Sequence, residues 1–173
     1  MLRLILITSP HRKLPLKGEF EGALITMPTI NQIPDEIIEE FLPLDEWMDR
    51  YQLLIDMGEE LSPLDQREKT EQNLIDGCQS RVWLVCDKDA DGRLVFRAES
   101  DALIVRGIVA LLLRVVSGHT PDEILSADLY FIPRIGLSEH LSPTRANGLL
   151  AMVKQIRNYA LVMKALPTNE SRE

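Results

Sequence analysis

The sequence predicts an α+β protein in which a small antiparallel sheet packs against several helices. Two β-like runs follow one another directly and are joined by a turn signal, whereas the segments before and after them have helical spacing of apolar residues. Strands and helices do not alternate, so we do not expect a parallel sheet. With 173 residues, 45% hydrophobic and 27% charged, the chain fits one globular domain.

Two helices are predicted before the sheet. Residues 34–42 begin with Pro34, and Asp35 and Glu36 follow; proline and acidic residues suit a first helical turn, where free N–H groups attract negative charge. In residues 44–61 the apolar side chains recur at three-four spacing, as expected of an amphipathic helix that faces the core. They are Leu44, Trp47, Met48, Tyr51, Leu54, Ile55 and Met57. Residues 62–73 are polar without periodicity and indicate a loop.

An antiparallel hairpin is predicted in the middle of the chain. The runs "SRVWLVCD" and "RLVFRAE" are rich in valine, leucine and aromatic residues, which favour strands. The segment "KDADG" separates them, and its Asp91-Gly92 pair is a hairpin-turn signal. Cys86 falls inside the first strand, so we interpret it as a small core residue.

Three helices are predicted after the hairpin. The segment "DALIVRGIVALLLRVVSG" is nearly all apolar and is expected to form a central buried helix after an N-cap at Ser100. Thr120 and Glu123 have the spacing of a capping box and indicate the start of a short helix. The segment "LSPTRANGLLAMVKQIRNYALVMKAL" predicts a last helix after Ser142, which docks on the sheet or on the central helix.

Charge and cysteine content restrict the partners and cofactors. The net charge of −8, from 27 acidic and 19 basic residues, repels phosphate backbones, so nucleic acid is not an expected partner. There is no run of about 18 apolar residues, so no membrane partner is expected either. Cys78 and Cys86 are too few for a disulfide framework or a closed zinc site, and no glycine-rich phosphate loop is present. We therefore expect no metal, no cofactor and a reducing compartment, the cytoplasm.

The ends of the chain are expected to lie outside the domain. The apolar run from Leu4 to Ile7 is shorter than the core of a secretory signal, so residues 1–28 are predicted to be a poorly ordered N-terminal extension. The domain is predicted to span residues 29–168, with a tail at residues 169–173.

Cys78 is the candidate nucleophile. It lies where a loop meets the first strand, between Gly77, which leaves the backbone free, and the polar residues Gln79 and Ser80. Only the thiolate is nucleophilic, and Arg81 is close in sequence but can point away along a pleated strand. From these features alone, a reactive and a structural role are equally compatible with the sequence.

Three sequence motifs, one of which contains Cys78, point to a protein family. The segments "IDGCQSRVWL", "ESDALIVRGIVALLL" and "GLSEHLSPTRANGLLAMV" occur in the order seen in the SufE family of sulfur-acceptor proteins, which includes the CsdE branch, and residues 33–166 resemble that family. The resemblance implies that Cys78 accepts a sulfane sulfur from the persulfide of a pyridoxal-phosphate cysteine desulfurase of the SufS or CsdA type and stimulates that enzyme. Cys78 would then deliver the sulfur to an iron–sulfur scaffold similar to SufBCD. Pyridoxal phosphate belongs to the partner.

The resemblance also implies roles for neighbouring residues. Gly77, Gln79, Ser80 and Arg106 are expected to contact the desulfurase or to support the cysteine loop, although a charged residue at the edge of a helix, such as Arg106, usually extends to solvent. The family shelters this loop in an apolar cavity, for which the central helix and Trp83 could supply walls. His140 and Arg145 match motif positions without an assigned catalytic role.

Other classes of protein remain open at this stage. An adaptor could bind the desulfurase without carrying sulfur. A cysteine hydrolase would pair Cys78 with His119 or His140 as a base within hydrogen-bond reach. A zinc-bearing acceptor of the SufU type would need more thiol ligands than the two cysteines provide.

Overall fold

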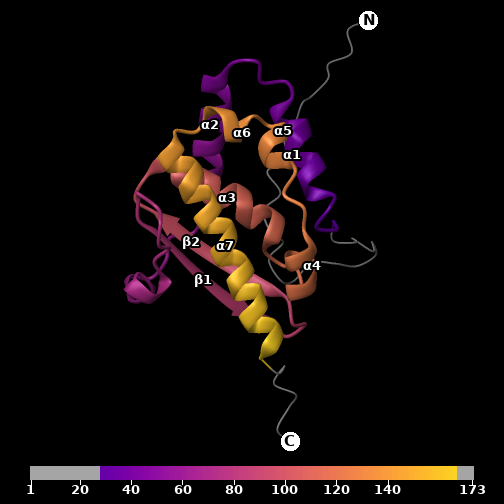
Figure 1. Ribbon diagram of the computed structural model, residues 1–173, viewed down its shortest axis with the longest axis vertical. Helices are drawn as coiled ribbons and strands as arrows, with labels where there is room; N and C mark the ends of the chain where they lie inside the picture. Colours follow the sequence, from indigo (N-terminus) through magenta and orange to yellow (C-terminus); the bar gives the residue numbers. More distant parts are fainter. Residues whose placement is uncertain (1–27, 167–173) are drawn as a thin grey trace, which may run out of the picture.

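The computed structural model describes residues 28–166 and has the predicted α+β architecture (Figure 1). The helices are α1 (Ile33–Phe41), α2 (Trp47–Glu59), α3 (Leu103–Val116), α4 (Pro121–Ser126), α5 (Phe131–Arg134), α6 (Leu137–His140) and α7 (Pro143–Ala165). The strands are β1 (Val82–Lys88) and β2 (Leu94–Ser100). Residues 1–27 of the predicted N-terminal extension lie outside the described residues, and so does the predicted tail at residues 169–173. In the described part of the chain, no helix is both long and apolar enough to cross a membrane.

The hairpin forms as predicted. β1 and β2 pair antiparallel, with Val82 opposite Ser100 at one end and Lys88 opposite Leu94 at the other. Alternate residues of β1 are buried, which is the period expected of a strand with one face on the core. Cys86 lies on that buried face opposite Phe96, in agreement with its interpretation as a core residue.

Helix α3 is the centre of the molecule and packs against α2 on one side and β2 on another (Figure 1). Glycines allow the close crossing of α2 and α3, because a Cβ atom added at Gly107 would lie 2.1 Å from the backbone oxygen of Leu54. The predicted N-cap at Ser100 is wrong: Ser100 ends β2, and Ala102 is the N-cap. The Ser100 hydroxyl accepts a hydrogen bond from the Ala102 N–H at 3.3 Å, so strand pairing places the helix start two residues later.

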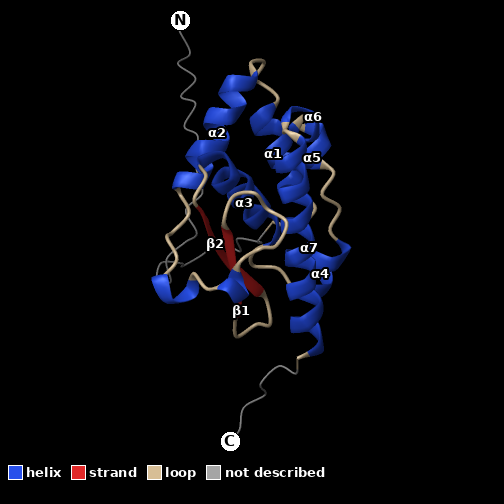
Figure 2. Ribbon diagram, turned by 60° about the vertical axis from the view of Figure 1, so that its left-hand side comes forward, coloured by secondary structure: helices blue, strands red, loops and turns tan. Residues whose placement is uncertain are grey.

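The sequence predicts that the last helix docks on the sheet or on the central helix, and α7 contacts both. The Tyr159 hydroxyl donates a hydrogen bond to the Leu84 backbone oxygen at 3.0 Å, and the Tyr159 ring packs edge-on against Phe96. On its other side α7 contacts α4, where Arg157 donates to the Ala127 oxygen at 3.3 Å. Figure 2 shows α7 beside α4, with the hairpin next to them.

Two short helices and two turns were not predicted. α5 and α6 have four residues each, and they meet at Gly136, whose φ of 75° requires the left-handed conformation. The predicted loop at residues 62–73 contains the 3₁₀ turns η1 (Gln66–Glu68) and η2 (Glu71–Asn73). A single turn is too short to show hydrophobic periodicity, which explains the omissions.

Candidate functional site

The loop that carries Cys78 is fixed at both ends. The Ile75 N–H donates to the Val82 oxygen at 2.8 Å and closes the loop at its base. The Arg81 N–H donates to a carboxylate oxygen of Asp101 at 3.0 Å, at the entrance to α3. Gly77, next to Cys78, has a φ of 88°, which few other residues adopt. The loop therefore has a firm base and a tip whose path depends on glycine.

The sulfur of Cys78 rests against helix α7. Cys78 Sγ lies 3.6 Å from the backbone oxygen of Gly148, to which the thiol donates a weak hydrogen bond. The side chain is half-buried, and this burial raises the pKa of the Cys78 thiol above its ordinary value. In this pose the sulfur is therefore held as a protonated, weakly nucleophilic thiol.

A cavity of about 80 Å³ adjoins the sulfur. The loop, α3 and α7 form its walls. Val105 and Ile108 of α3 and Met152 of α7 are buried apolar residues, whereas Thr144 and Arg145 at the start of α7 are exposed. The remaining lining residues are Cys78, Gln79, Ser80 and Gly148. A space with apolar side chains on one wall and polar side chains on another can hold a small group partly out of water.

Two of the loop residues predicted from the sequence lie with Cys78 at this cavity. Gln79 and Ser80 line it beside Cys78. Gly77 faces α7, because a Cβ atom added there would lie 3.6 Å from the Cβ atom of Ala151. Gln79 and Ser80 thus lie at the cavity, and Gly77 lies next to α7.

Arg106 and Trp83 do not line the cavity beside Cys78. Arg106 donates from Nη2 to the Leu61 oxygen at 3.1 Å, just beyond the end of α2, and its buried Nε has no hydrogen-bond partner among the described residues. Val105 and Ile108 line the cavity instead, since a step of one residue turns a side chain by about 100° around a helix. The expectation that Trp83 supplies a wall is wrong: Trp83 lies beneath Lys69, with Nζ 5.8 Å from the ring centre, and is not among the lining residues.

Helix α7 supplies a wall of the cavity that was not predicted from the sequence. Thr144, Gly148 and Met152 are spaced four residues apart and therefore share one face of the helix, the face that lines the cavity. A glycine inside a strongly predicted helix was the available signal, because glycine weakens helices and is retained where another group approaches closely.

Neither described histidine lies at the cavity. His119 is buried near the hairpin turn and Glu123, with its Nδ1 atom 3.7 Å from a carboxylate oxygen. His140 stacks on Trp47 with ring centres 3.9 Å apart. Within residues 28–166, no group of three or more His, Cys, Asp or Glu side chains could hold a metal ion.

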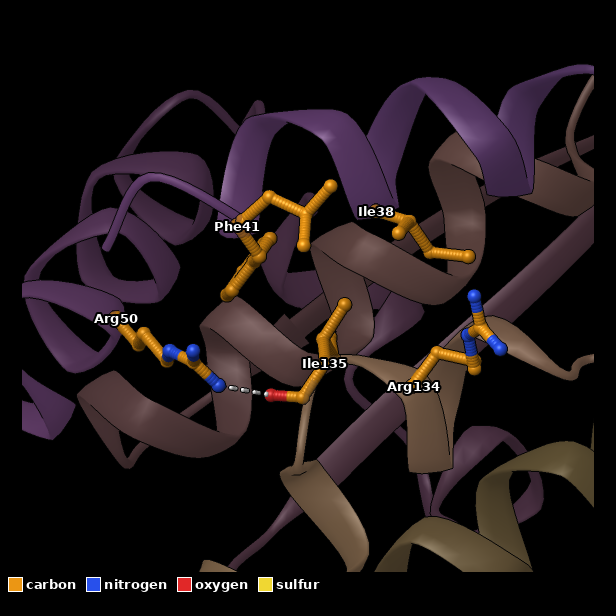
Figure 3. Close-up of a pocket in the computed structure, with 6 residues that line it drawn as sticks. Ile38, Phe41, Arg50, Arg134 and Ile135 are labelled. Carbon is orange, nitrogen blue, oxygen red and sulfur yellow. Dashed lines mark hydrogen bonds between the residues drawn. The ribbon is translucent and has the colours of Figure 1, made fainter. Parts of the chain in front are cut away.

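A second, smaller cavity lies between α1, α2 and α5 (Figure 3). Its volume is about 20 Å³, enough for about one water molecule. Arg50 on its wall donates to the Ile135 oxygen at 2.9 Å and so ties α2 to the segment after α5. We interpret this cavity as a packing space.

Fold and site together define a small α+β protein that holds one loop thiol against a partly apolar cavity, without a histidine beside it among the described residues. A family model, SufE, described as an Fe-S metabolism associated domain, matches residues 35–160. The chain belongs to the SufE family.

Similar proteins support this membership. An uncharacterized SufE-like protein of Rhizobium meliloti (strain 1021) is 45% identical over 130 residues, which cover 73% of this chain and 93% of the relative. Another from Rhizobium etli is 44% identical over 135 residues, covering 76% and 91%. The solution structure of a hypothetical protein from Thermus thermophilus has a TM-score of 0.66 at 20% identity and covers 79% of this chain and 98% of that one, which shows a shared fold.

Proposed function

We propose that this protein accepts sulfur on Cys78 from a cysteine desulfurase of the SufS or CsdA type, stimulates that enzyme and carries the sulfur toward iron–sulfur cluster assembly. Membership of a family associated with Fe-S metabolism supports the general role. The observation that carries the specific proposal is the position of Cys78: a loop thiol that adjoins a partly apolar cavity of about 80 Å³.

The transfer is a thiol exchange in which atoms and charges balance. The Cys78 thiolate attacks the outer sulfur of the donor's persulfide, Cys–S–SH. A new S–S bond forms on Cys78 while the donor's S–S bond breaks, and the donor cysteine leaves as a thiolate. No oxidant or reductant is consumed.

Acceptance requires a different pose of Cys78 from the sheltered one. Burial raises the pKa of the thiol in the sheltered pose, so attack requires the sulfur to leave the cavity and become a thiolate. Gly77 gives the loop tip conformational freedom, while the hydrogen bonds at Ile75 and Arg81 keep its base in place. After acceptance, return to the cavity would protect the persulfide from water and reductants.

Two alternatives account less well for this site. A hydrolase needs a base within reach of the thiol, and His119 and His140 both lie away from the cavity. An adaptor that only binds the desulfurase would not need a sheltered cysteine. In our proposal the protein needs no metal or cofactor of its own, the pyridoxal phosphate being the partner's, and works in the reducing cytoplasm with a SufBCD-like scaffold as the next acceptor.

Desulfurase turnover separates a carrier from an adaptor. Alanine formation from cysteine is measured with the desulfurase alone and with the added protein, in the presence of reductant. The wild type is expected to stimulate turnover, Cys78→Ser to bind without stimulating, and Cys86→Ser to stimulate like the wild type. Equal stimulation by Cys78→Ser would instead support the adaptor.

A further inference from the structure

Gly148 occupies a position in α7 where a glycine is unfavourable for the helix. It lies well inside the helix, is buried, and has a helical conformation that any residue could adopt. Glycine is among the poorest helix formers, and alanine is the best. The position is therefore better explained by what lies next to the glycine than by the helix itself.

The neighbour of Gly148 is Cys78. A Cβ atom added at Gly148 would lie 3.4 Å from Cys78 Sγ, 3.9 Å from its Cα and 4.0 Å from its Cβ, and these are the three nearest atoms. The backbone oxygen of Gly148 also accepts the hydrogen bond from the thiol. One residue thus supplies both the acceptor and the free space at the sulfur.

A persulfide needs more of this space than a thiol does. The outer sulfur is bonded to Sγ at about 2.05 Å. It cannot follow the direction of the thiol hydrogen, because the Gly148 oxygen lies only 3.6 Å from Sγ, so the persulfide must turn away from that oxygen. Its room is the adjoining cavity, which Gly148 lines. A methyl group at position 148 would lie 3.4 Å from Sγ, in van der Waals contact with the thiol sulfur. It would take up space next to Sγ on the wall of the cavity that the outer sulfur needs.

We propose that Gly148 is a positioning residue that leaves room for the outer sulfur of the Cys78 persulfide. The biological role of this space rests on the proposed function, whereas the test below does not depend on that function. Alanine at position 148 is compatible with the resting thiol and incompatible with the sheltered persulfide. The variant would therefore hold its persulfide in the exposed pose, where reductants reach it.

The test loads Cys78 chemically, without a desulfurase. Inorganic polysulfide is the donor in wild type, Gly148→Ala and the control Asn147→Ala, all in a Cys86→Ser background. The Cys78 thiolate attacks a terminal sulfur of the polysulfide, an S–S bond of the polysulfide breaks, and hydrosulfide or the shorter polysulfide leaves. The control changes an exposed residue of the same helix. Dithiothreitol is then added, and mass spectrometry follows the loss of the sulfur; each persulfide plus one dithiol gives Cys78 thiol, hydrogen sulfide and the cyclic disulfide of the reductant.

We expect Gly148→Ala to lose its sulfur at least about fivefold faster than wild type, because the rate follows the exposed fraction, and Asn147→Ala to stay within about twofold. The rate at which the reduced Cys78 thiol is alkylated should differ from the wild-type rate by less than about twofold in both variants. Loss from Gly148→Ala within about twofold of wild type would overturn the inference. A thermal midpoint of Gly148→Ala clearly below wild type would also overturn it, because the methyl group would then be excluded from the thiol form.

A parallel arm separates this inference from the proposed function. The same proteins are incubated with a cysteine desulfurase and cysteine. If wild type takes no sulfur from the enzyme while Gly148→Ala still loses polysulfide-derived sulfur faster, the proposed function fails and the role of Gly148 stands.

Discussion

Two cysteines of one chain differ in chemistry because of where their side chains lie. Cys86 is on the buried face of β1, and burial together with the nearby Asp87 carboxylate raises the pKa of its thiol to about 12. Cys78 is in a loop, half-buried, and beside a cavity. Cys86 is therefore protonated at neutral pH and inaccessible, whereas Cys78 needs only a movement of its loop to react.

The difference in burial between the two cysteines should appear in the free energy of unfolding when each is replaced by serine. Cys86→Ser buries a hydroxyl that can find only weak partners, so it should lower the free energy of unfolding by about 1–3 kcal/mol. Cys78→Ser lies in a loop and should change it by less than about 0.5 kcal/mol. Urea unfolding of both variants gives the comparison. A larger loss for Cys78→Ser than for Cys86→Ser would contradict the assignment of the two residues.

At the scale of elements, the crossing of α2 and α3 fixes where the cavity wall stands. Gly58 and Gly107 face each other across the crossing, and a Cβ atom at Gly58 would lie 2.8 Å from the Gly107 nitrogen. Arg106 adds a hydrogen bond from α3 to the Leu61 oxygen. These contacts hold one side of α3, while Val105 and Ile108 face the sulfur on another.

Replacing a glycine by alanine at this crossing should lower stability, although helix propensity alone favours alanine. Gly107→Ala would gain about 1 kcal/mol from propensity alone, yet the overlap with the Leu54 carbonyl predicts a net loss of about 3 kcal/mol or more in the free energy of unfolding. Gly118→Ala is the control, because an added Cβ there meets nothing within 4 Å and only its φ of 83° is unfavourable, which costs about 1–2 kcal/mol. Urea unfolding should rank Gly107→Ala as clearly the less stable; equal losses would contradict the close crossing.

The elements differ in how far sequence alone predicts them. Long periodic segments such as α2, α3 and α7, and the hairpin with its Asp91-Gly92 turn, are confirmed because their patterns repeat several times. The four-residue helices α5 and α6 escape prediction because one turn has no period. At the site, motif resemblance singled out Cys78, but Gly148 and Met152 come from a helix about 70 residues away in sequence, and only tertiary packing brings them together.

For the molecule as a whole, one buried histidine links stability to pH. His119 is enclosed by the core, its Nδ1 atom has no hydrogen-bond partner among the described residues, and Glu123 and Arg93 are the charges nearby. Burial lowers the pKa of His119 below its ordinary value, and the Glu123 carboxylate offsets this only in part. The folded protein therefore keeps the imidazole neutral.

The unfolding free energy should consequently fall as the solution is acidified. Below about pH 6.5 the unfolded chain binds a proton on this imidazole that the folded protein does not, so stability present above that pH is lost as pH falls toward the lower folded pKa. Urea unfolding between pH 7.5 and about pH 5.5 should give a shallower dependence in His119→Gln than in wild type. The same slope in both would show that another group is responsible.

The most direct measurement of the central claim is the transfer of one sulfur atom. A SufS- or CsdA-type desulfurase is first loaded with its persulfide and freed of cysteine, then mixed with the full chain, and both proteins are analysed by intact and peptide mass spectrometry. We predict that the desulfurase loses one sulfur atom and that the peptide containing Cys78 gains it, in wild type and in Cys86→Ser but not in Cys78→Ser. Sulfur that stays on the desulfurase, or that arrives on Cys86 with Cys78 unmodified, would contradict the account.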